Sequence, residues 1–507
     1  MVGVPSTVIG AALAIGLLCL VAAALWLAWR RPFVALGVLV AGMAFHNFVL
    51  MVLLVLRTPP QLIRAVQSWK ELVIGLLALL AATQLIRQRR EWRIQMQQMV
   101  EMDWVAIAFT AVLVVYLFIP SSLLPGGANF VQRLLAFRTA LLIPLIYFLG
   151  RYFSRPSQRD LRDASWIVVG AGAAVGAFGL YELWFVPTTR WLDWGVNLYS
   201  NWLGFAYKGP AGLPENFFQS LPDGFLLRRM VSTYISPLGI AYTGLISWPV
   251  AVVLLDRAIA SRRAAAATGL AATFLLLGIL FSVTRLALAM IAGEAVILAL
   301  LLRTSVAFSL APVVVGGVVA ILLVYPYVGP VVDPSLLPGA SQQHTIIYIG
   351  DPSLAEHVRA LSGDMRFVLQ HPLGDGLGAS VHRFIDPSLA ATGTGESAIF
   401  GMFGDIGLLG GALHLAMYGL ALYYGLRALR ATPRGSLARF LPLVACVGGL
   451  VLAPIALTSD VWSDFSVTFL YWWAVGYSAS VATRRLATTP QNGPTQGDTV
   501  KLKGEPA

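Results

Sequence analysis

Five arginines stand at the edges of long apolar runs or in the hydrophilic stretch between two of them. Arg228 and Arg229 come shortly before one run, and Arg285 opens another. Arg359 and Arg366 lie seven residues apart in a hydrophilic segment. A guanidinium group stays charged in a partly dry site and binds phosphate oxygens in pairs. The residue type and its placement therefore predict a site for an anionic, lipid-linked group at a membrane surface, most simply a diphosphate.

Three side chains near these arginines could move a proton. Glu396 directly precedes an apolar run, and His371 and His382 lie in the same hydrophilic stretch. A carboxylate or an imidazole at the mouth of an arginine-lined cavity can act as a general base. Glu396 has a second reading as a carboxylate that stabilises the start of a helix. Each histidine has a second reading as an ordinary surface residue.

Composition decides which elements position these residues. The 507 residues are 58% hydrophobic and 12% charged, with a mean hydropathy of +0.76. A water-exposed exterior needs far more polar surface, so we predict an all-α polytopic membrane domain over residues 1–485. It should contain about 12–13 transmembrane helices, and residues 486–507 should form a disordered cytoplasmic tail. The candidate spans lie near 7–28, 33–56, 71–86, 104–120, 134–150, 165–185, 236–255, 266–284, 286–302, 306–327, 397–425, 440–458 and 465–482.

The net charge of +11 does not indicate a nucleic-acid partner, because the basic residues fall in clusters that alternate with the spans. A single threading puts seven clusters on one side: Arg30/Arg31, Arg87/Arg89/Arg90/Arg93, Arg151/Arg155/Arg159/Arg162, Arg257/Arg262/Arg263, Arg303, Arg427/Arg430/Arg434/Arg439 and Arg484/Arg485. By the positive-inside rule that side is the cytoplasm. The hydrophilic segments 186–235 and 328–396 are then outside, and Arg285 lies at an outer helical turn. A lone arginine there can also be a simple interfacial anchor.

The second outer segment has internal order. The stretch "DPSLAEHVRALSGDMRFVLQHP" (351–372) predicts a helix, with Asp351 as its cap and Pro352 at its first position. Its apolar residues recur at helical spacing, so we expect them to pack as one stripe on the membrane helices. The stripe consists of Leu354, Val358, Leu361, Met365 and Leu369. The following turn, "HPLGDGLG" (371–378), could bring backbone N–H groups close to an anion.

Two segments that contain arginines named above together resemble a known family. "RRMVSTYISP" (228–237) is similar to the Arg-x-x-Gly-Thr-Phe…Pro pattern of the O-antigen ligase and polymerase superfamily, with Ser232 in place of glycine and Tyr234 in place of phenylalanine. "FSVTRLALAM" (281–290) resembles the family's Thr-x-Ser-Arg turn, so that Arg285 matches its arginine. Thr284 stands where serine is common in that turn.

The later segments continue the resemblance in the same order. The run from Arg359 to "HPLGDGLG" resembles the arginine-containing helix and Pro…Gly-x-Gly of the family's large periplasmic loop. "GESAIFGMFGDIGLLGG" (395–411) is similar to the start of the family's next span. Together the similar segments fall within roughly residues 100–480.

The resemblance implies a GT-C-like fold and a metal-independent glycosyltransferase without a cofactor. Such enzymes act at the outer face of the bacterial inner membrane on glycans linked to undecaprenyl diphosphate. Their partners are the lipid-linked glycan donor, a glycan acceptor, and proteins of chain-length control or export. By this resemblance the five arginines, led by Arg229 and Arg285, hold the diphosphate. Glu396, His371 or His382 takes the proton of the acceptor.

Three alternatives stay open. The ligase branch, which transfers glycan to a lipid A core, commonly has a His-Asn pair where this chain has Glu396 and Ser397, and this difference favours the polymerase branch. A flippase for lipid-linked oligosaccharides would also need cationic residues, but it should show charges within spans and repeated halves. A purely structural membrane subunit would leave the long outer segments without a purpose.

Overall fold

The computed structural model describes residues 5–87, 352–379, 397–488, and 99–330 without 205, 208, 210, 211 and 221–225. In this part, twelve helical stretches are long and apolar enough to cross a membrane, which confirms a polytopic membrane protein. Within a bilayer a helix is the element that satisfies every backbone polar group internally. The stretches are α1 (Ser6–Arg30), α2 (Pro32–Val55), α4 (Trp69–Arg87), α6 (Glu101–Phe118), α7 (Phe130–Tyr152), α8 (Gln158–Phe185), α11 (Pro237–Ala258), α12 (Arg262–Phe281), α13 (Arg285–Leu302), α14 (Ser305–Val328), α16 (Ala398–Ala431) and Leu437–Thr458, which contains α17 (Phe440–Leu443) and α18 (Gly449–Thr458).

The last predicted span, 465–482, is also helical and forms α19 (Phe465–Thr488). From Phe469 to Val475 every side chain is at most 1% exposed, so other helices surround α19 on all sides. Glycines allow α7 and α19 to approach closely. A Cβ atom at Gly476 would lie 2.0 Å from the carbonyl oxygen of Tyr147, and one at Gly150 would lie 2.5 Å from that of Trp473. Small residues at a helix interface are typical of membrane bundles.

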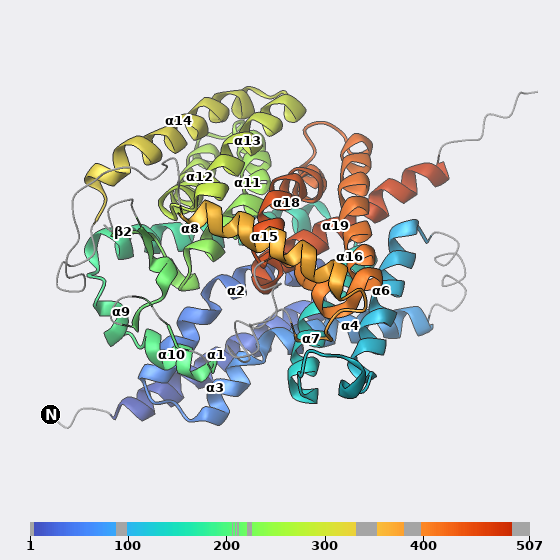
Figure 1. Cartoon of the computed structure of the whole chain (residues 1–507). Helices are drawn as coiled ribbons and strands as arrows, with labels where there is room; N and C mark the ends of the chain where they lie inside the picture. Colours follow the sequence, from blue (N-terminus) through green and yellow to red (C-terminus); the bar gives the residue numbers. More distant parts are fainter. Residues whose placement is uncertain are drawn as a thin grey trace, which may run out of the picture.

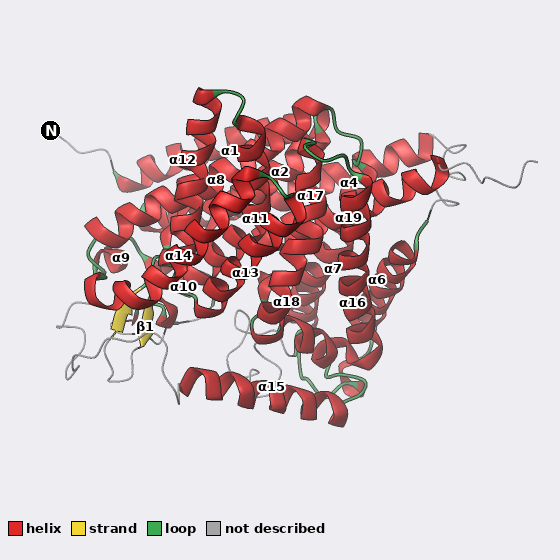
Figure 2. Ribbon diagram, turned by 90° about the horizontal axis from the view of Figure 1, so that it is seen from above, coloured by secondary structure: helices red, strands yellow, loops and turns green. Residues whose placement is uncertain are grey.

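The described residues of the predicted outer segment 186–235 include short helices and a hairpin. The segment contains two short helices, α9 (Arg190–Asp193) and α10 (Val196–Trp202). Strands β1 (Phe218–Ser220) and β2 (Leu226–Arg228) follow and form an antiparallel hairpin in which Phe218 pairs with Arg228. The turn η4 (Ser232–Tyr234) leads into α11. These elements lie at the same end of the bundle as α15 (Figure 2).

The second outer segment contains the predicted helix as α15 (Pro352–Gln370), which lies across one end of the bundle (Figures 1 and 2). Its predicted apolar stripe does not pack on the other helices, because Val358, Met365 and Leu369 are 60%, 58% and 74% exposed. The buried face instead contains Asp364 and Val368. The side chain of Leu354 and the cap residue Asp351 lie outside the described part.

The rotation of α15 has a physical cause. The turn that follows the helix is bonded to α16, and this attachment decides which face of α15 meets the bundle. Periodicity alone finds the apolar face of a helix but not the partner it meets. An apolar face turned outward at a membrane surface can instead contact lipid.

Candidate anion-binding site

The two arginine-bearing motifs meet in space. Arg229 follows β2 and lies against the turn between α12 and α13, more than fifty residues further along the chain. Its Nε donates to the carbonyl oxygen of Ser282 (2.8 Å), and its Nη2 donates to Thr284 Oγ1 (2.7 Å). The backbone N–H of Met230 donates to the carbonyl oxygen of Phe281 (2.9 Å). Local hydrogen bonds therefore fix Arg229 beside the start of α13.

Arg285 is the first residue of α13 and is half-buried, whereas Arg229 is 8% exposed. Burial above all, and also the nearby positive charge of Arg285, lower the pKa of Arg229 to about 10. Arg229 therefore remains a cation at neutral pH. Two cations that share a poorly solvated place are costly unless an anion joins them. The N-terminus of α13 adds its partial positive charge at the same point.

The backbone of both motifs is strained. Ser232, Ile235 and Val283 have φ angles of +45°, +56° and +49°, in the left-handed region that L residues avoid. Ser232 stands where the resembled pattern has glycine, and its Oγ donates to the carbonyl oxygen of Val175 (2.7 Å). Such backbone costs on the order of 1–3 kcal/mol per residue and gathers at functional sites. The strained positions follow Arg229 by three and six residues and precede Arg285 by two.

Arg228 has a different environment from its neighbour. Its Nη2 lies 2.6 Å from Glu182 Oε1, and both side chains are almost fully buried. The same guanidinium donates to the backbone carbonyl oxygens of Glu182 and Val186. These contacts neutralise Arg228 inside the protein and join the hairpin to α8. Arg228 therefore differs from Arg229, because an internal carboxylate already balances its charge.

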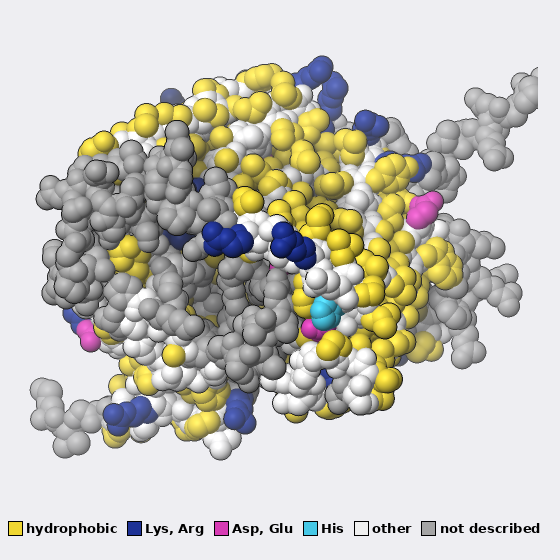
Figure 3. Space-filling model, viewed as in Figure 1, with side chains coloured by type: hydrophobic (Ala, Val, Ile, Leu, Met, Phe, Trp, Pro, Cys, Tyr) yellow, Lys and Arg dark blue, Asp and Glu magenta, His cyan; other side chains and the backbone are white. Residues whose placement is uncertain are grey.

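Arg359 and Arg366 are exposed on α15. Figure 3 shows two basic side chains along this helix, on the face turned away from the bundle. Arg229, by contrast, is buried between the hairpin and the α12–α13 turn. The structure thus does not bring Arg359 and Arg366 into one buried cluster with Arg229. Exposed cations such as the arginines of α15 can attract an anion to this end of the bundle.

His371 is held in a defined orientation. Its Nδ1 lies 2.8 Å from Asp375 Oδ1, and its ring stacks on Phe367 with a centroid distance of 4.3 Å. A carboxylate partner on Nδ1 orients an imidazole whose other nitrogen can take a proton. The other two predicted bases, Glu396 and His382, lie outside the described residues. Among the residues described, Ser397 is the cap of α16 and accepts from the N–H of Phe400 (3.1 Å).

The glycine-rich turn 371–378 does not present its N–H groups to an anion. α16 is broken at Ile406 and Gly407, which leaves backbone groups of the helix without their usual partners. The N–H of Asp375 donates to the carbonyl oxygen of Gly404 (2.7 Å), and the N–H of Gly376 donates to that of Asp405 (3.1 Å). The expectation of an anion-binding turn is therefore corrected. The turn closes the break in α16 and attaches α15 to it.

Sequence reasoning missed Asp464, which lies just before α19. Its Oδ1 accepts from the N–H of Ser466 (3.1 Å), and its Oδ2 is fully enclosed although the residue as a whole is half-buried. Burial raises the pKa of Asp464 to about 7. The hydroxyl of Tyr234, from the first arginine motif, donates to Ser466 Oγ (3.1 Å). An acid with such a pKa suits proton transfer at neutral pH.

A signal for Asp464 was available in the sequence. It is an acidic residue at the start of a predicted outer-facing span, the same placement that drew attention to Glu396. Its burial, however, depends on α11 and on Tyr234, more than two hundred residues away. In the part of the chain with described coordinates, no three His, Cys, Asp or Glu residues gather as a metal site would need.

Comparison with known proteins finds no family model that matches this chain and no curated protein that matches it. The site consists of a buried arginine beside a half-buried one, at a helix start, in a polytopic membrane bundle.

Proposed function

We propose that the protein is a membrane glycosyltransferase that polymerises or transfers glycan repeats carried on undecaprenyl diphosphate. The proposed reaction belongs to O-antigen or exopolysaccharide synthesis at the outer face of the bacterial inner membrane. The observation that carries the proposal is the position of Arg229 beside Arg285 at the start of α13. A diphosphate neutralises two adjacent guanidinium groups, and a lipid carrier delivers it at membrane level.

The proposed reaction uses these charges. A hydroxyl group of the acceptor glycan attacks the anomeric carbon of the donor, and the bond from that carbon to the diphosphate oxygen breaks. Arg229 and Arg285 stabilise the negative charge that develops on the departing lipid diphosphate. A general base takes the proton of the attacking hydroxyl. The candidates for this base are Glu396, His371, His382 and Asp464.

Two observations rank the alternatives. Glu396 and Ser397 stand where ligases of the resembled family commonly carry His-Asn, and this supports polymerisation over transfer to a lipid A core. Glu294 is 0% exposed midway along α13, and its carboxylate oxygens have no hydrogen-bond partner among the described residues. An ionisable group inside a span is typical of transporters. It therefore keeps a flippase of lipid-linked oligosaccharides as the second candidate.

The full-length protein in lipid nanodiscs, given one defined lipid-linked repeat, tests the proposal. We expect a ladder of longer glycans and release of one lipid diphosphate per bond formed. A product only when lipid A core is added would indicate the ligase. Movement of the donor across liposome membranes without a covalent product would indicate the flippase and contradict the proposed enzyme.

The same assay identifies the base through two nearly isosteric changes, Glu396→Gln and Asp464→Asn. Loss of a general base is expected to lower chain extension about 100-fold or more while donor binding is kept. Measurements of protein stability distinguish a catalytic role of Asp464 from a structural one. Because its pKa is raised to about 7 in the folded protein, the fold favours the protonated acid, and stability falls as the pH rises from about 4 to 7.

Asp464→Asn removes this fall, so the variant should unfold at pH 8 at a temperature no lower than the wild type. An inactive Asp464→Asn variant with an unchanged or higher unfolding temperature would assign Asp464 as the base. Full activity in both variants would move the search to His371 and His382.

A further inference from the structure

A cavity lies at the opposite end of the bundle from Arg229 and Arg285, and the proposed reaction does not use it. Its volume is about 1030 Å³. α8 connects the two places, since Asp160 near its start lines the cavity and Glu182 near its end binds Arg228. Twenty-two residues of helix span about 33 Å, close to the thickness of a hydrocarbon core. The cavity therefore lies at the other membrane surface.

The wall of this cavity is strongly basic. Among the described residues, five arginines and two acidic residues, Asp103 and Asp160, line it. The arginines are Arg30, Arg31, Arg151, Arg155 and Arg484. Three of the clusters that the positive-inside rule assigns to the cytoplasm are thus brought together. The lining residues that the structure describes carry a net charge of +3.

The two acids are already paired. Asp160 lies 2.6 Å from Arg31, and Asp103 lies 2.6 Å from Arg151. Arg484 donates to the carbonyl oxygen of Ser154 (2.8 Å) and to Ser480 Oγ (2.9 Å), which are neutral groups. Arg155 is exposed, and no described acidic side chain forms an ion pair with it. The positive charge of Arg155 is therefore available to a ligand.

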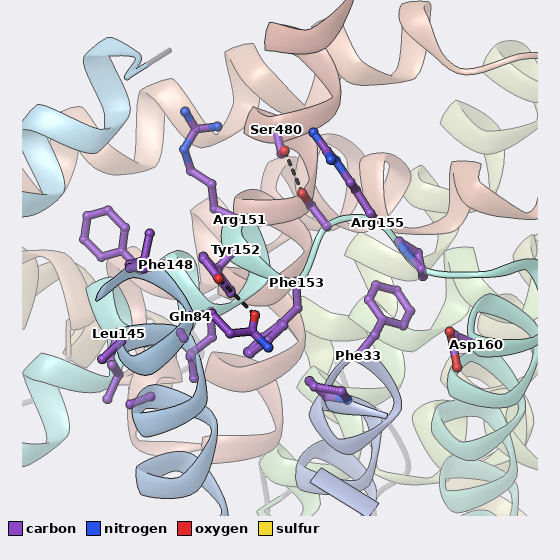
Figure 4. A pocket seen from close by; sticks show the side chains of 18 of the residues that line it. Phe33, Gln84, Leu145, Phe148, Arg151, Tyr152, Phe153, Arg155, Asp160 and Ser480 are labelled. Carbon is purple, nitrogen blue, oxygen red and sulfur yellow. Dashed lines mark hydrogen bonds between the residues drawn. The ribbon is translucent and has the colours of Figure 1, made fainter. Parts of the chain in front are cut away.

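The other wall is apolar. On α7, Leu145 and Phe148 come first, and Arg151 follows where the helix ends (Figure 4). Across from them α4 contributes small and apolar residues, and Gln84 of α4 accepts a hydrogen bond from the hydroxyl of Tyr152 (3.0 Å). The apolar lining residues of these two helices are Ala78, Ala81, Ala82, Leu85, Leu145, Phe148 and Leu149. The cavity thus changes from apolar to basic along one direction, as an amphiphile does.

We propose that this cavity binds an anionic phospholipid. Its phosphate lies beside Arg155 and Arg484, and an acyl chain lies along the apolar wall of α4 and α7. A basic pocket between membrane helices at the cytoplasmic surface suits such a headgroup. A soluble phosphate would use the arginines alone and leave the apolar wall without a role. The phospholipid uses both walls.

Native mass spectrometry of the purified full chain tests this proposal. Phosphatidylglycerol should bind, and phosphatidylcholine with the same acyl chains should not. Arg155→Gln should weaken phosphatidylglycerol binding about fivefold, since one arginine near such a surface is worth that much. Arg155→Lys should keep most of the binding. Arg155 is the residue of choice because its exposed side chain makes no described ion pair that the fold depends on.

Arg159→Gln is the matched control. This exposed arginine lies four residues beyond Arg155 but does not line the cavity, so binding should stay unchanged. Equal binding of both lipids, or an equal loss in Arg155→Gln and Arg159→Gln, would overturn the proposal. Excess glycerol phosphate should not displace the lipid. Displacement at similar concentrations would show that the site binds a soluble phosphate, and the lipid would be excluded.

Discussion

Arg285→Lys is expected to lower turnover of the lipid-linked donor about 100- to 1000-fold, the effect of removing one donor that stabilises a developing oxyanion. Lysine keeps the positive charge but loses the fork of N–H groups that binds two phosphate oxygens at once. Arg229 lies beside Arg285 and is itself bonded to Ser282 and Thr284. It cannot swing over to replace the missing contacts. Release of lipid diphosphate, measured in nanodiscs, reports the loss.

Arg303→Lys provides the control for this variant. Arg303 follows the last residue of the same helix, at the end opposite Arg285, and is exposed. The change alters the same functional group without touching the proposed site, so turnover should match the wild type. If Arg285→Lys is as active as Arg303→Lys while both insert normally, Arg285 is only an interfacial anchor. The diphosphate site would then have to be sought elsewhere.

The membrane helices could be predicted closely from the sequence, because their signal is local. An apolar run of suitable length has few alternatives in a bilayer. The start of α15 at Pro352 could also be predicted from neighbouring residues, since proline suits the first position of a helix. The rotation of α15 about its axis could not be predicted in this way. It depends on the hydrogen bonds from Asp375 and Gly376 to the broken part of α16.

The candidate site was also predictable only in part. The sequence could predict that Arg229 lies near Arg285, because the span assignment places both at the same membrane surface. The different environments of Arg228 and Arg229 could not be predicted, since adjacent arginines look equivalent in a sequence. Their roles differ because Glu182 binds only Arg228. Glu182 lies on the side of α8 that faces Arg228. The signal for it in the sequence was an acidic residue within an apolar run.

Glu182→Gln is expected to lower the free energy of unfolding by about 3–5 kcal/mol, because it leaves the buried charge of Arg228 without its ion partner. Glutamine has nearly the same shape, so packing around α8 stays the same. Glu182 also accepts from the indole N–H of Trp191 (3.0 Å), a bond that the glutamine oxygen can keep. Thermal and denaturant unfolding of the detergent-purified protein measure the change.

Asp193→Asn is the matched control, because its ion pair with Arg190 is exposed and should contribute no more than about 1 kcal/mol. Adding Arg228→Met to Glu182→Gln should recover part of the loss, since the double variant no longer buries an unpaired cation. A Glu182→Gln variant as stable as Asp193→Asn would show that another group neutralises Arg228. A bound anion is the group that could do so, and Arg228 would then rejoin Arg229 and Arg285 in the diphosphate site.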